Sequence, residues 1–302
     1  MCALFGLVDY GNKFSARQKN KIISVLSEEC EIRGTDATGI AYNSNGRLHI
    51  FKRAVPAHKM RYRLPENADI IMGHTRMTTQ GSETFNYNNH PFFGTANGVN
   101  FALAHNGVLH NDTLLRKSEK LPETHIRTDS YVAVQLIEKK KSLDFASLKN
   151  MAEKVAGSFC FTVLTDRNEL YFVKGDNPLS LYKFDGFYIY ASTEEILKNT
   201  LQKLNLSKYS RVNINCGDIL KLDSNGAVEV GHFDFHEAFY GGYGGYFSET
   251  DEDYLEELSL LYGIKPEDIL TLLDYGFGVF DIEKILCCPE IMRDYFRGIG
   301  TR

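Results

Sequence analysis

The feature that most restricts the fold of this 302-residue chain is the way its short apolar segments are grouped. Most of these segments alternate apolar and polar residues, as β-strands do, and several follow one another across a short turn. The turn Asn43-Ser44-Asn45-Gly46 joins two such segments, and Asn225-Gly226 joins another two. Strands joined by turns of this kind are antiparallel. Strands are expected over residues 2–9, 38–53 (as a hairpin), 69–77, 100–105, 158–164, 169–173, 186–191, 218–222 and 227–232.

Helical segments interrupt these strands in groups and do not alternate with them one by one. Ser15 and Gln18 form a capping-box signature before a periodic apolar stretch, and Ser192 with Glu195 repeats the signature. Antiparallel strand sets with grouped helices predict an α+β layered fold, and not the regular βαβ alternation of a doubly wound sheet. Helices are expected after both signatures and over residues 129–140 and 143–155.

The charge and hydropathy of the chain exclude several classes of partner. The formal net charge of -5 argues against nucleic acid or an anionic membrane, because both require a basic face. No stretch approaches the roughly 20 apolar residues that cross a bilayer. The first ten residues lack the basic start of a secretory signal. A cytoplasmic protein is therefore expected, with no nucleic acid and no membrane among its partners.

Six cysteines are scattered along the chain, at positions 2, 30, 160, 216, 287 and 288. None belongs to a C-x-x-C pair, which indicates reduced thiols and neither a disulfide framework nor a zinc site. Cys287 and Cys288 fall on an expected helix and are interpreted as core residues. His232 and His236 are four residues apart, but the residues between them alternate like a strand, so no metal site is expected there.

The character of the sequence changes after residue 234. Residues 235–248 include the Gly/Tyr-rich run Tyr240–Tyr246, which has no periodicity and is interpreted as a linker. Residues 249–302 are expected to form a short helical tail, with helices near 251–262, 266–275 and 281–288. Such a tail has a small core, so it is expected to pack on the main domain, residues 2–234, or on a partner.

Cys2 has a chemical property that no other cysteine of the chain shares. Removal of Met1 would leave a thiol and a free α-amino group on the same residue. Their ordinary pKa values, about 8.5 and about 7.7–8.0, are close enough for the amine to act as general base to the thiol. The alternative is that Cys2 is merely a small residue in a strand.

Six short blocks, the first of which contains Cys2, favour the chemical interpretation. They are Met1–Gly6, Arg33–Ile40, Gly73–Arg76, Asn89–Phe92, Ala104–Gly107 and Thr128–Ser130. Together they resemble the class II glutamine amidotransferases, including the glutaminase domains of glucosamine-6-phosphate synthase and amidophosphoribosyltransferase. The resemblance reaches to about residue 230 and implies the four-layer αββα sandwich of the N-terminal nucleophile hydrolases, followed here by a small C-terminal helical appendage.

The same resemblance implies a role for each site residue. Cys2 is the nucleophile that forms a thioester with the glutamine side chain, while Asn106 and Gly107 form the oxyanion hole. Arg76 binds the α-carboxylate of glutamine and Asp129 its α-amino group, since a selective site needs a cation and an anion for the two charges. The residues implied to line the pocket or support it are Thr79, Gln80, His74 with no part in catalysis, and Arg33 as a structural residue near Cys2. No cofactor and no metal are implied.

Some of these residues have simpler interpretations. Asn106-Gly107 taken alone is typical of a hairpin turn. Asp129, or Thr128 beside it, is also a suitable N-cap for the expected helix over residues 129–140. Met77 stands where several relatives have an aromatic residue after His-Thr-Arg.

Three functions are compatible with these features. The first is hydrolysis of the glutamine amide to glutamate and ammonia, with the ammonia passed to a separate synthase, because no phosphate-binding signature follows residue 234. The second is the same chemistry on another γ-glutamyl amide. The third is a non-catalytic binding protein that kept the fold.

Overall fold

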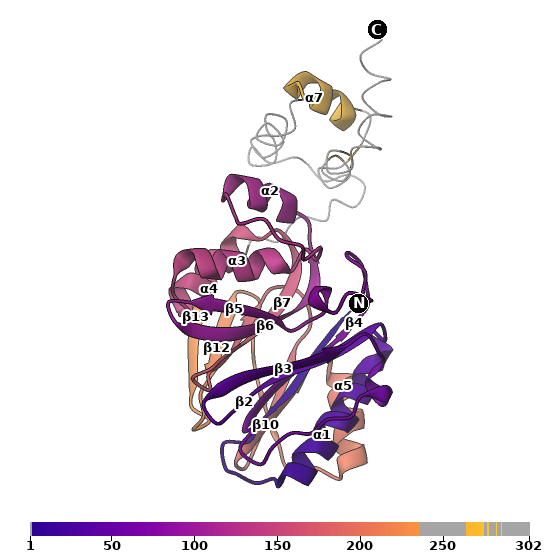
Figure 1. Cartoon of the computed structure of the whole chain (residues 1–302), viewed down its shortest axis with the longest axis vertical. Coiled ribbons are helices and arrows are strands. Elements are labelled where there is room, and N and C mark those ends of the chain that lie inside the picture. The colour runs from indigo at the N-terminus through magenta and orange to yellow at the C-terminus, as the bar shows by residue number, and fades with distance from the viewer. Residues whose placement is uncertain (1, 236–263, 275–276, 278–281, 283–284, 286–302) are drawn as a thin grey trace.

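The computed structural model describes residues 2–235, 264–274, 277, 282 and 285. Two antiparallel β-sheets pack face to face, and helices cover the outer face of each (Figure 1). The predicted α+β sandwich of four layers is therefore confirmed.

The first sheet has seven strands in the order β11-β9-β10-β1-β4-β2-β3. Strand β1 is the middle strand and pairs with β4 on one side and β10 on the other. The strands are β1 (Ala3–Val8), β2 (Ala37–Ser44), β3 (Arg47–Arg53), β4 (Ile70–Arg76), β9 (Ser180–Phe184), β10 (Phe187–Ala191) and β11 (Ser210–Val212).

The second sheet has six strands in the order β13-β12-β8-β7-β6-β5. Its longest strand, β6, pairs with β7 from Phe101 to Leu109 but with β5 only over its first half. The strands are β5 (Phe92–Ala96), β6 (Val99–Leu109), β7 (Gly157–Thr165), β8 (Leu170–Lys174), β12 (Asp218–Leu222) and β13 (Val228–His232).

Strand β1 is apolar throughout because both of its faces are buried. Leu4 and Val8 point into the core between the two sheets, together with residues such as Met72 and Phe172. Phe5 and its neighbours on the other face pack under helices. Side chains alternate between the two faces of a strand, so a strand between two apolar layers requires a continuous apolar run.

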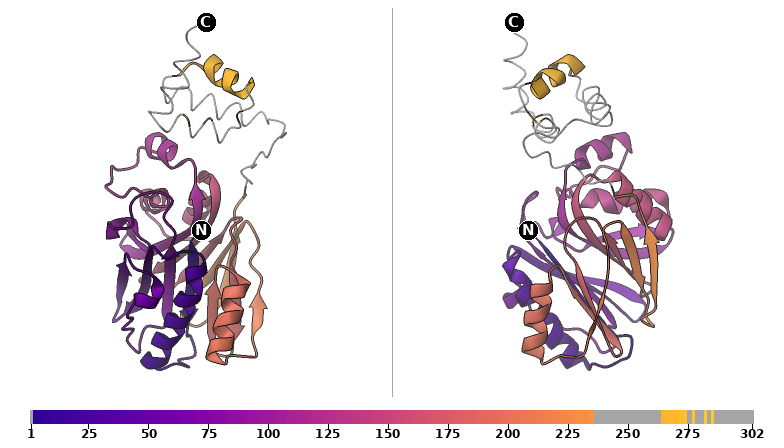
Figure 2. Two further views of the ribbon diagram at one scale, coloured as in Figure 1. Left: turned by 90° about the vertical axis from the view of Figure 1, so that its right-hand side faces the viewer. Right: turned by 180° about the vertical axis from the view of Figure 1, so that it is seen from behind.

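Helices form the two outer layers. α1 (Ala16–Glu29) and α5 (Glu194–Leu204) lie side by side on the seven-stranded sheet (Figure 2). α3 (Tyr131–Lys140) and α4 (Phe145–Lys154) cover the six-stranded sheet. The remaining elements are α2 (Asp112–Ser118), α7 (Pro266–Asp274) and the 3₁₀ turns η1 (Cys30–Ile32), η2 (Ala57–Lys59) and η3 (Asn86–Asn88).

The predicted strands and the four helices predicted up to residue 204 are confirmed to within a few residues. Ser15 caps α1 through the predicted capping box with Gln18. The predicted caps of two later helices are wrong, because Thr193 caps α5 and Ser130 is the N-cap of α3. The elements that the sequence did not predict are β5, β9, β11 and α2.

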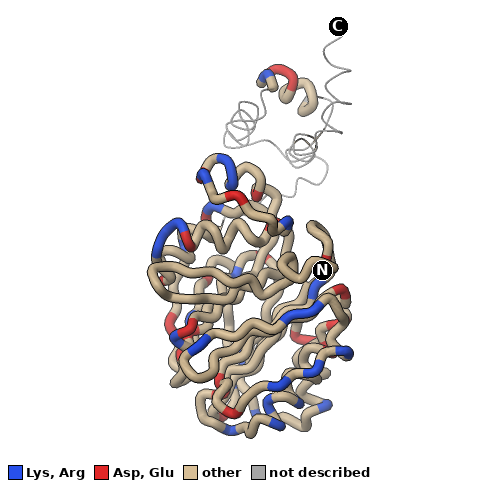
Figure 3. The backbone as a smooth tube through the Cα atoms, viewed as in Figure 1, with Lys and Arg blue, Asp and Glu red and all other residues tan. Residues whose placement is uncertain are grey.

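The tail is described only in part. α7 confirms the helix predicted over residues 266–275, while the other two predicted helices, and most of the linker, lie outside the described residues. No helix among the described residues combines the length and apolarity needed to span a membrane. Lysine and arginine are interspersed with aspartate and glutamate over both halves of the sandwich (Figure 3).

Candidate active site

Cys2 lies immediately before β1, in the middle of the seven-stranded sheet. The pairing of Ala3 with Thr75 brings it level with the last residue of β4. The backbone N–H of Met77 donates to Cys2 Sγ at 3.4 Å, and Sγ lies 3.5 Å from the Met77 carbonyl oxygen. Cys2 is partly exposed. The thiol is therefore held at the end of two paired strands, on a residue that is only partly exposed.

The pKa of the Cys2 thiol is raised, mainly because burial disfavours the thiolate. The hydrogen bond from Met77 and the positive charge of Arg76 lower it in part, and the negative charge of Asp129 raises it. Both charges thus act on the sulfur. The resting group is a neutral thiol at neutral pH, so attack by Cys2 requires a base that removes its proton.

Arg33 connects Cys2 with Asn106. Its Nε donates to the Cys2 carbonyl oxygen at 2.8 Å, and its Nη2 lies 3.5 Å from Asn106 Oδ1. The neighbouring Gly34 packs so closely on Arg76 that a Cβ there would stand 2.4 Å from the Arg76 carbonyl carbon. The segment that follows Arg33 therefore needs glycine in order to lie against the end of β4.

Asn106 and Gly107 lie inside β6, so the hairpin-turn interpretation is wrong. They pair with Cys160 and Phe159 of β7. Asn106 is fully buried, and Gly107 has a φ of +147°. A Cβ at Gly107 would lie 1.8 Å from the Ser158 carbonyl oxygen. This part of the strand approaches β7 more closely than any residue with a side chain allows.

Replacement of Gly107 by alanine is expected to lower the free energy of unfolding by at least about 3 kcal/mol, because the new methyl group overlaps a backbone oxygen. Denaturant titration measures the effect. Gly98→Ala is the matched control, since Gly98 also has a positive φ but open space around its Cβ position. The control should cost only about 1–2 kcal/mol. Equal losses in the two variants would contradict the steric argument.

Among the described residues, no strand pairs with one edge of β6 near Gly107. Strand β5 pairs with β6 only as far as Leu103. Beyond that point, the His105 carbonyl accepts from His74 Nε2 at 2.9 Å, and the Leu109 N–H donates to Asp129 Oδ2 at 2.7 Å. Backbone groups of alternate residues point to the same side of a strand. The Gly107 N–H is thus expected at this edge.

Arg76 is buried at the end of β4. Its Nη1 donates to Asn89 Oδ1 at 2.6 Å, and its Nη2 donates to the carbonyl oxygens of Gln80 and Gly81 at 2.5 and 2.9 Å. Burial lowers its pKa from the usual high value, but a guanidinium remains charged in proteins. The site therefore contains a fixed cation whose donors are partly used by the chain itself.

Asp129 is buried directly before α3. Its Oδ2 accepts the Leu109 N–H, and its Oδ1 accepts from Ser130 Oγ at 3.3 Å. The helix-cap interpretation of Asp129 is wrong, and so is that of Thr128, because Ser130 occupies the N-cap position. Asp129 is held to β6 by contacts across 20 residues of sequence, which places its charge beside the strand that carries Asn106.

Three buried histidines lie next to the site. Burial lowers the pKa of His74 to about 3 and also lowers those of His90 and His105. The rings of His74 and His90 lie with centroids 4.2 Å apart and planes tilted by 39°, and His105 Nδ1 lies 2.8 Å from Ser130 Oγ. All three are therefore neutral at pH 7. Among the described residues, their contacts are with neighbouring side chains and backbone groups of the sandwich.

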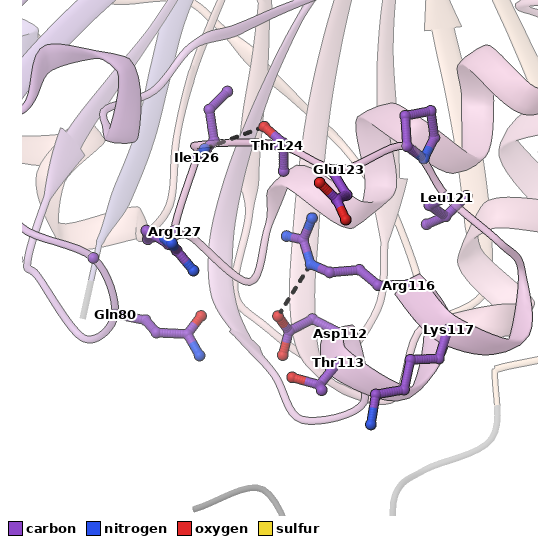
Figure 4. Close-up of a pocket in the computed structure, with 12 residues that line it drawn as sticks. Gln80, Asp112, Thr113, Arg116, Lys117, Leu121, Glu123, Thr124, Ile126 and Arg127 are labelled. Atoms are coloured by element: carbon purple, nitrogen blue, oxygen red, sulfur yellow. Dashed lines mark hydrogen bonds and ion pairs between the residues drawn. The ribbon is translucent and has the colours of Figure 1, made fainter. Parts of the chain in front are cut away.

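Thr79 and Gln80 follow the end of β4 and are exposed. Gln80 lies at the rim of a cavity of about 770 Å³ that extends along α2 (Figure 4). An ion pair between Asp112 and Arg116, 3.7 Å apart, lies on one wall. The cavity lining is Gln80, Gly81, Asp112, Thr113, Arg116, Lys117, Leu121, Pro122, Glu123, Thr124, Ile126 and Arg127.

Within the part of the chain that the structure describes, no group of histidine, cysteine and acidic residues could hold a metal ion. His232 lies on β13 and contacts Asp218 through Nδ1 at 2.9 Å, while His236 lies outside the described residues. Cys287 and Cys288 also lie outside them.

Sequence reasoning did not assign roles to three residues that the structure places in these contacts. Asn89 binds Arg76, Ser130 contacts Asp129, and Ser192 lies 3.4 Å from Asn106 Nδ2. The first two belong to blocks that carry the resemblance, which was the available signal. Ser192 lies within the stretch to about residue 230 that the resemblance covers, but its local pattern indicated a helix cap.

Comparison with known proteins identifies the domain. A family described as "Glutamine amidotransferase domain" matches residues 74–199. A glutamine–fructose-6-phosphate aminotransferase (isomerizing) of Bacillus thuringiensis is 30% identical over 200 residues, which cover 64% of this chain and 32% of the relative. Its counterpart in Staphylococcus aureus is 28% identical over 240 residues, 76% of this chain and 38% of the relative. The chain spans about a third of the length of these curated relatives.

Two solved structures share the fold. Glutamine phosphoribosylpyrophosphate amidotransferase from B. subtilis superposes with a TM-score of 0.63 at 19% identity, covering 78% of this chain and 50% of that one. The structure of "the allosteric regulatory enzyme of purine biosynthesis" gives a TM-score of 0.63 at 18% identity, covering 87% and 59% of the two chains. The chain therefore matches a glutamine amidotransferase domain over residues 74–199, and the two solved structures share its fold.

Proposed function

We propose that this domain hydrolyses the side-chain amide of glutamine through a thioester on Cys2, giving glutamate and ammonia. The observation that carries the proposal is that Cys2 Sγ accepts the N–H of Met77, the residue next to Arg76, while Arg33 connects the Cys2 carbonyl to Asn106 and Asp129 binds the strand of Asn106. A thiol, a cation, an anion and a carboxamide thus meet where β1, β4 and β6 come together.

The first step requires a base, because the Cys2 thiol is neutral at rest. Removal of Met1 would supply it in the α-amino group of Cys2 itself, which takes the thiol proton as Sγ attacks the amide carbon. The buried histidines are unsuited to this task, because burial disfavours their protonated form and so makes them poor proton acceptors. His74 also already contacts the His105 carbonyl oxygen. The amine then returns the proton to the departing ammonia.

The tetrahedral intermediate carries a negative oxygen that needs aimed donors. Asn106 Nδ2–H and the Gly107 N–H are the proposed donors, supported by the burial of Asn106 and by the open edge of β6 at Gly107. Water then attacks the thioester and releases glutamate. In this scheme the intermediate is stabilised chiefly by groups that are fixed before the substrate arrives.

The charges of free glutamine match the two fixed charges of the site. We assign Arg76 to the α-carboxylate and Asp129 to the α-ammonium group, with Thr79 and Gln80 at the pocket rim. Arg76 already donates to the Gln80 and Gly81 carbonyls, so a carboxylate would use its remaining N–H groups or displace these carbonyls. The released ammonia would pass to an acceptor-binding protein or domain outside residues 2–234, since the matched segment is only about a third of the relatives' length.

Asp129→Asn is expected to raise the KM for glutamine about 10- to 100-fold, because an amide retains the hydrogen bonds to Leu109 and Ser130 but loses the charge that pairs with the α-ammonium group. Steady-state glutamate formation by the purified chain measures it and tests the proposed function. Asp112→Asn is the matched control at a nearby carboxylate and should change KM less than about threefold. An unchanged KM in Asp129→Asn, or no turnover by the unmodified chain, would refute the proposal.

A further inference from the structure

The hydroxyl of Ser192 joins the strand that follows the proposed nucleophile to the proposed oxyanion donor. Ser192 directly follows β10 and is fully buried. Its Oγ accepts the Leu4 N–H at 2.8 Å and lies 3.4 Å from Asn106 Nδ2. Its own N–H donates to the Leu4 carbonyl oxygen at 2.9 Å. Ser192 thus continues the pairing of β10 with β1 and contacts β6 of the other sheet.

The carboxamide of Asn106 is held at both ends. Its Oδ1 faces Arg33 Nη2, and a guanidinium has only donors, so the atom facing Arg33 must be the oxygen. The nitrogen therefore faces Ser192 Oγ. Of the two Nδ2 protons, Ser192 accepts one. Because a polar group faces each end of the amide, these two contacts favour one orientation of its plane and one direction for the second proton.

We propose that Ser192 is a positioning residue that aims the second N–H of Asn106 at the oxyanion. The proposal rests on the proposed function, because it assumes that Asn106 donates to this oxygen. The distance of 3.4 Å is at the long end of the hydrogen-bond range. Ser192 itself does not touch the substrate.

The adjacent residue, Thr193, also carries a hydroxyl, but that hydroxyl has a different partner. Thr193 Oγ1 accepts from the Ile196 N–H at 3.4 Å and caps α5. Two consecutive hydroxyls thus have separate partners, one in its own helix and the other at the junction of the two sheets. Thr193→Ala is therefore a matched control that removes a cap at a cost of about 1 kcal/mol without altering Asn106.

The test measures kcat and KM for glutamine in four chains: unmodified, Ser192→Ala, Asn106→Ala and the double variant. Ser192→Ala should lower kcat roughly tenfold with KM within about twofold, because a misaimed donor weakens the transition state more than substrate binding. In the Asn106→Ala background the same change should lower kcat less than about twofold. Thr193→Ala should leave kcat within about twofold of the unmodified chain.

Two results would overturn the proposal. One is an equal loss of kcat in both backgrounds, which would mean that Ser192 acts by supporting Leu4 and β1. The other is an unchanged kcat in Ser192→Ala. If that variant does not fold, Ser192→Cys keeps nearly the same size with a much weaker acceptor and is expected to show the same dependence on Asn106. Turnover by the unmodified chain tests the proposed function separately from these ratios.

Discussion

Replacing Cys2 with alanine is expected to lower glutamine turnover by at least about 10³-fold, because no other group can form the thioester. The measurement combines glutamate formation with intact-mass analysis after incubation with a glutamine-like diazo-ketone. The unmodified chain should lack Met1 and gain one adduct, on Cys2. Cys2→Ala should gain none.

The exposed Cys216 provides the matched control for this prediction. Cys216→Ala should retain turnover and the single adduct, because Cys216 follows β11 and has no part in the proposed chemistry. Cys30 and Cys160 are buried in the core, and burial raises the pKa of Cys160 to about 12, so neither should react. Labelling of any thiol other than Cys2 would refute the assignment of the nucleophile.

Asn106→Ala is expected to reduce kcat by about 10²–10³-fold with a much smaller change in KM, because an oxyanion donor acts mainly in the transition state. Truncation also removes the contacts that Asn106 makes with Arg33 and Ser192, which should cost about 1–3 kcal/mol of stability. Steady-state kinetics and thermal unfolding separate the two effects.

Asn100→Ala is the control for the loss of an asparagine from the same strand. Asn100 lies near the start of β6, where it contacts Asp166. The Asn100→Ala variant should have a slightly lower free energy of unfolding and an unchanged kcat. A raised KM with an unchanged kcat in Asn106→Ala would show that Asn106 binds glutamine and does not stabilise the oxyanion.

The sequence predicted best those features that depend on neighbouring residues. The capping box of Ser15 and Gln18 formed as expected, as did the hairpin around Asn45-Gly46. Such features are decided by a few adjacent backbone groups, whose partners are visible in a short window of sequence. The strands beside the site were also predicted correctly, because a continuous apolar run in the sequence requires burial on both faces of the strand.

Local patterns were wrong where a distant partner competes. Asn106-Gly107 fits a turn by itself, but pairing with β7 extends the strand through it. Asp129 and Ser192 both fit helix caps, but their oxygens accept backbone N–H groups 20 and 188 residues away. The unpredicted β11 has only three residues, too few for a periodic signal, and β5 has Gly94 at its centre, which weakens a strand pattern.

The position of Cys2 next to the middle strand of the seven-stranded sheet affects how the protein loses activity as it unfolds. Fraying begins at the edges of a sheet, and the strands at its centre separate only in the global unfolding reaction. Three strands flank β1 on each side, and Cys2 itself is anchored through Arg33. Local openings that leave most of the sandwich intact would therefore spare the sulfur, so that catalytic capacity and the native state should disappear in one cooperative event.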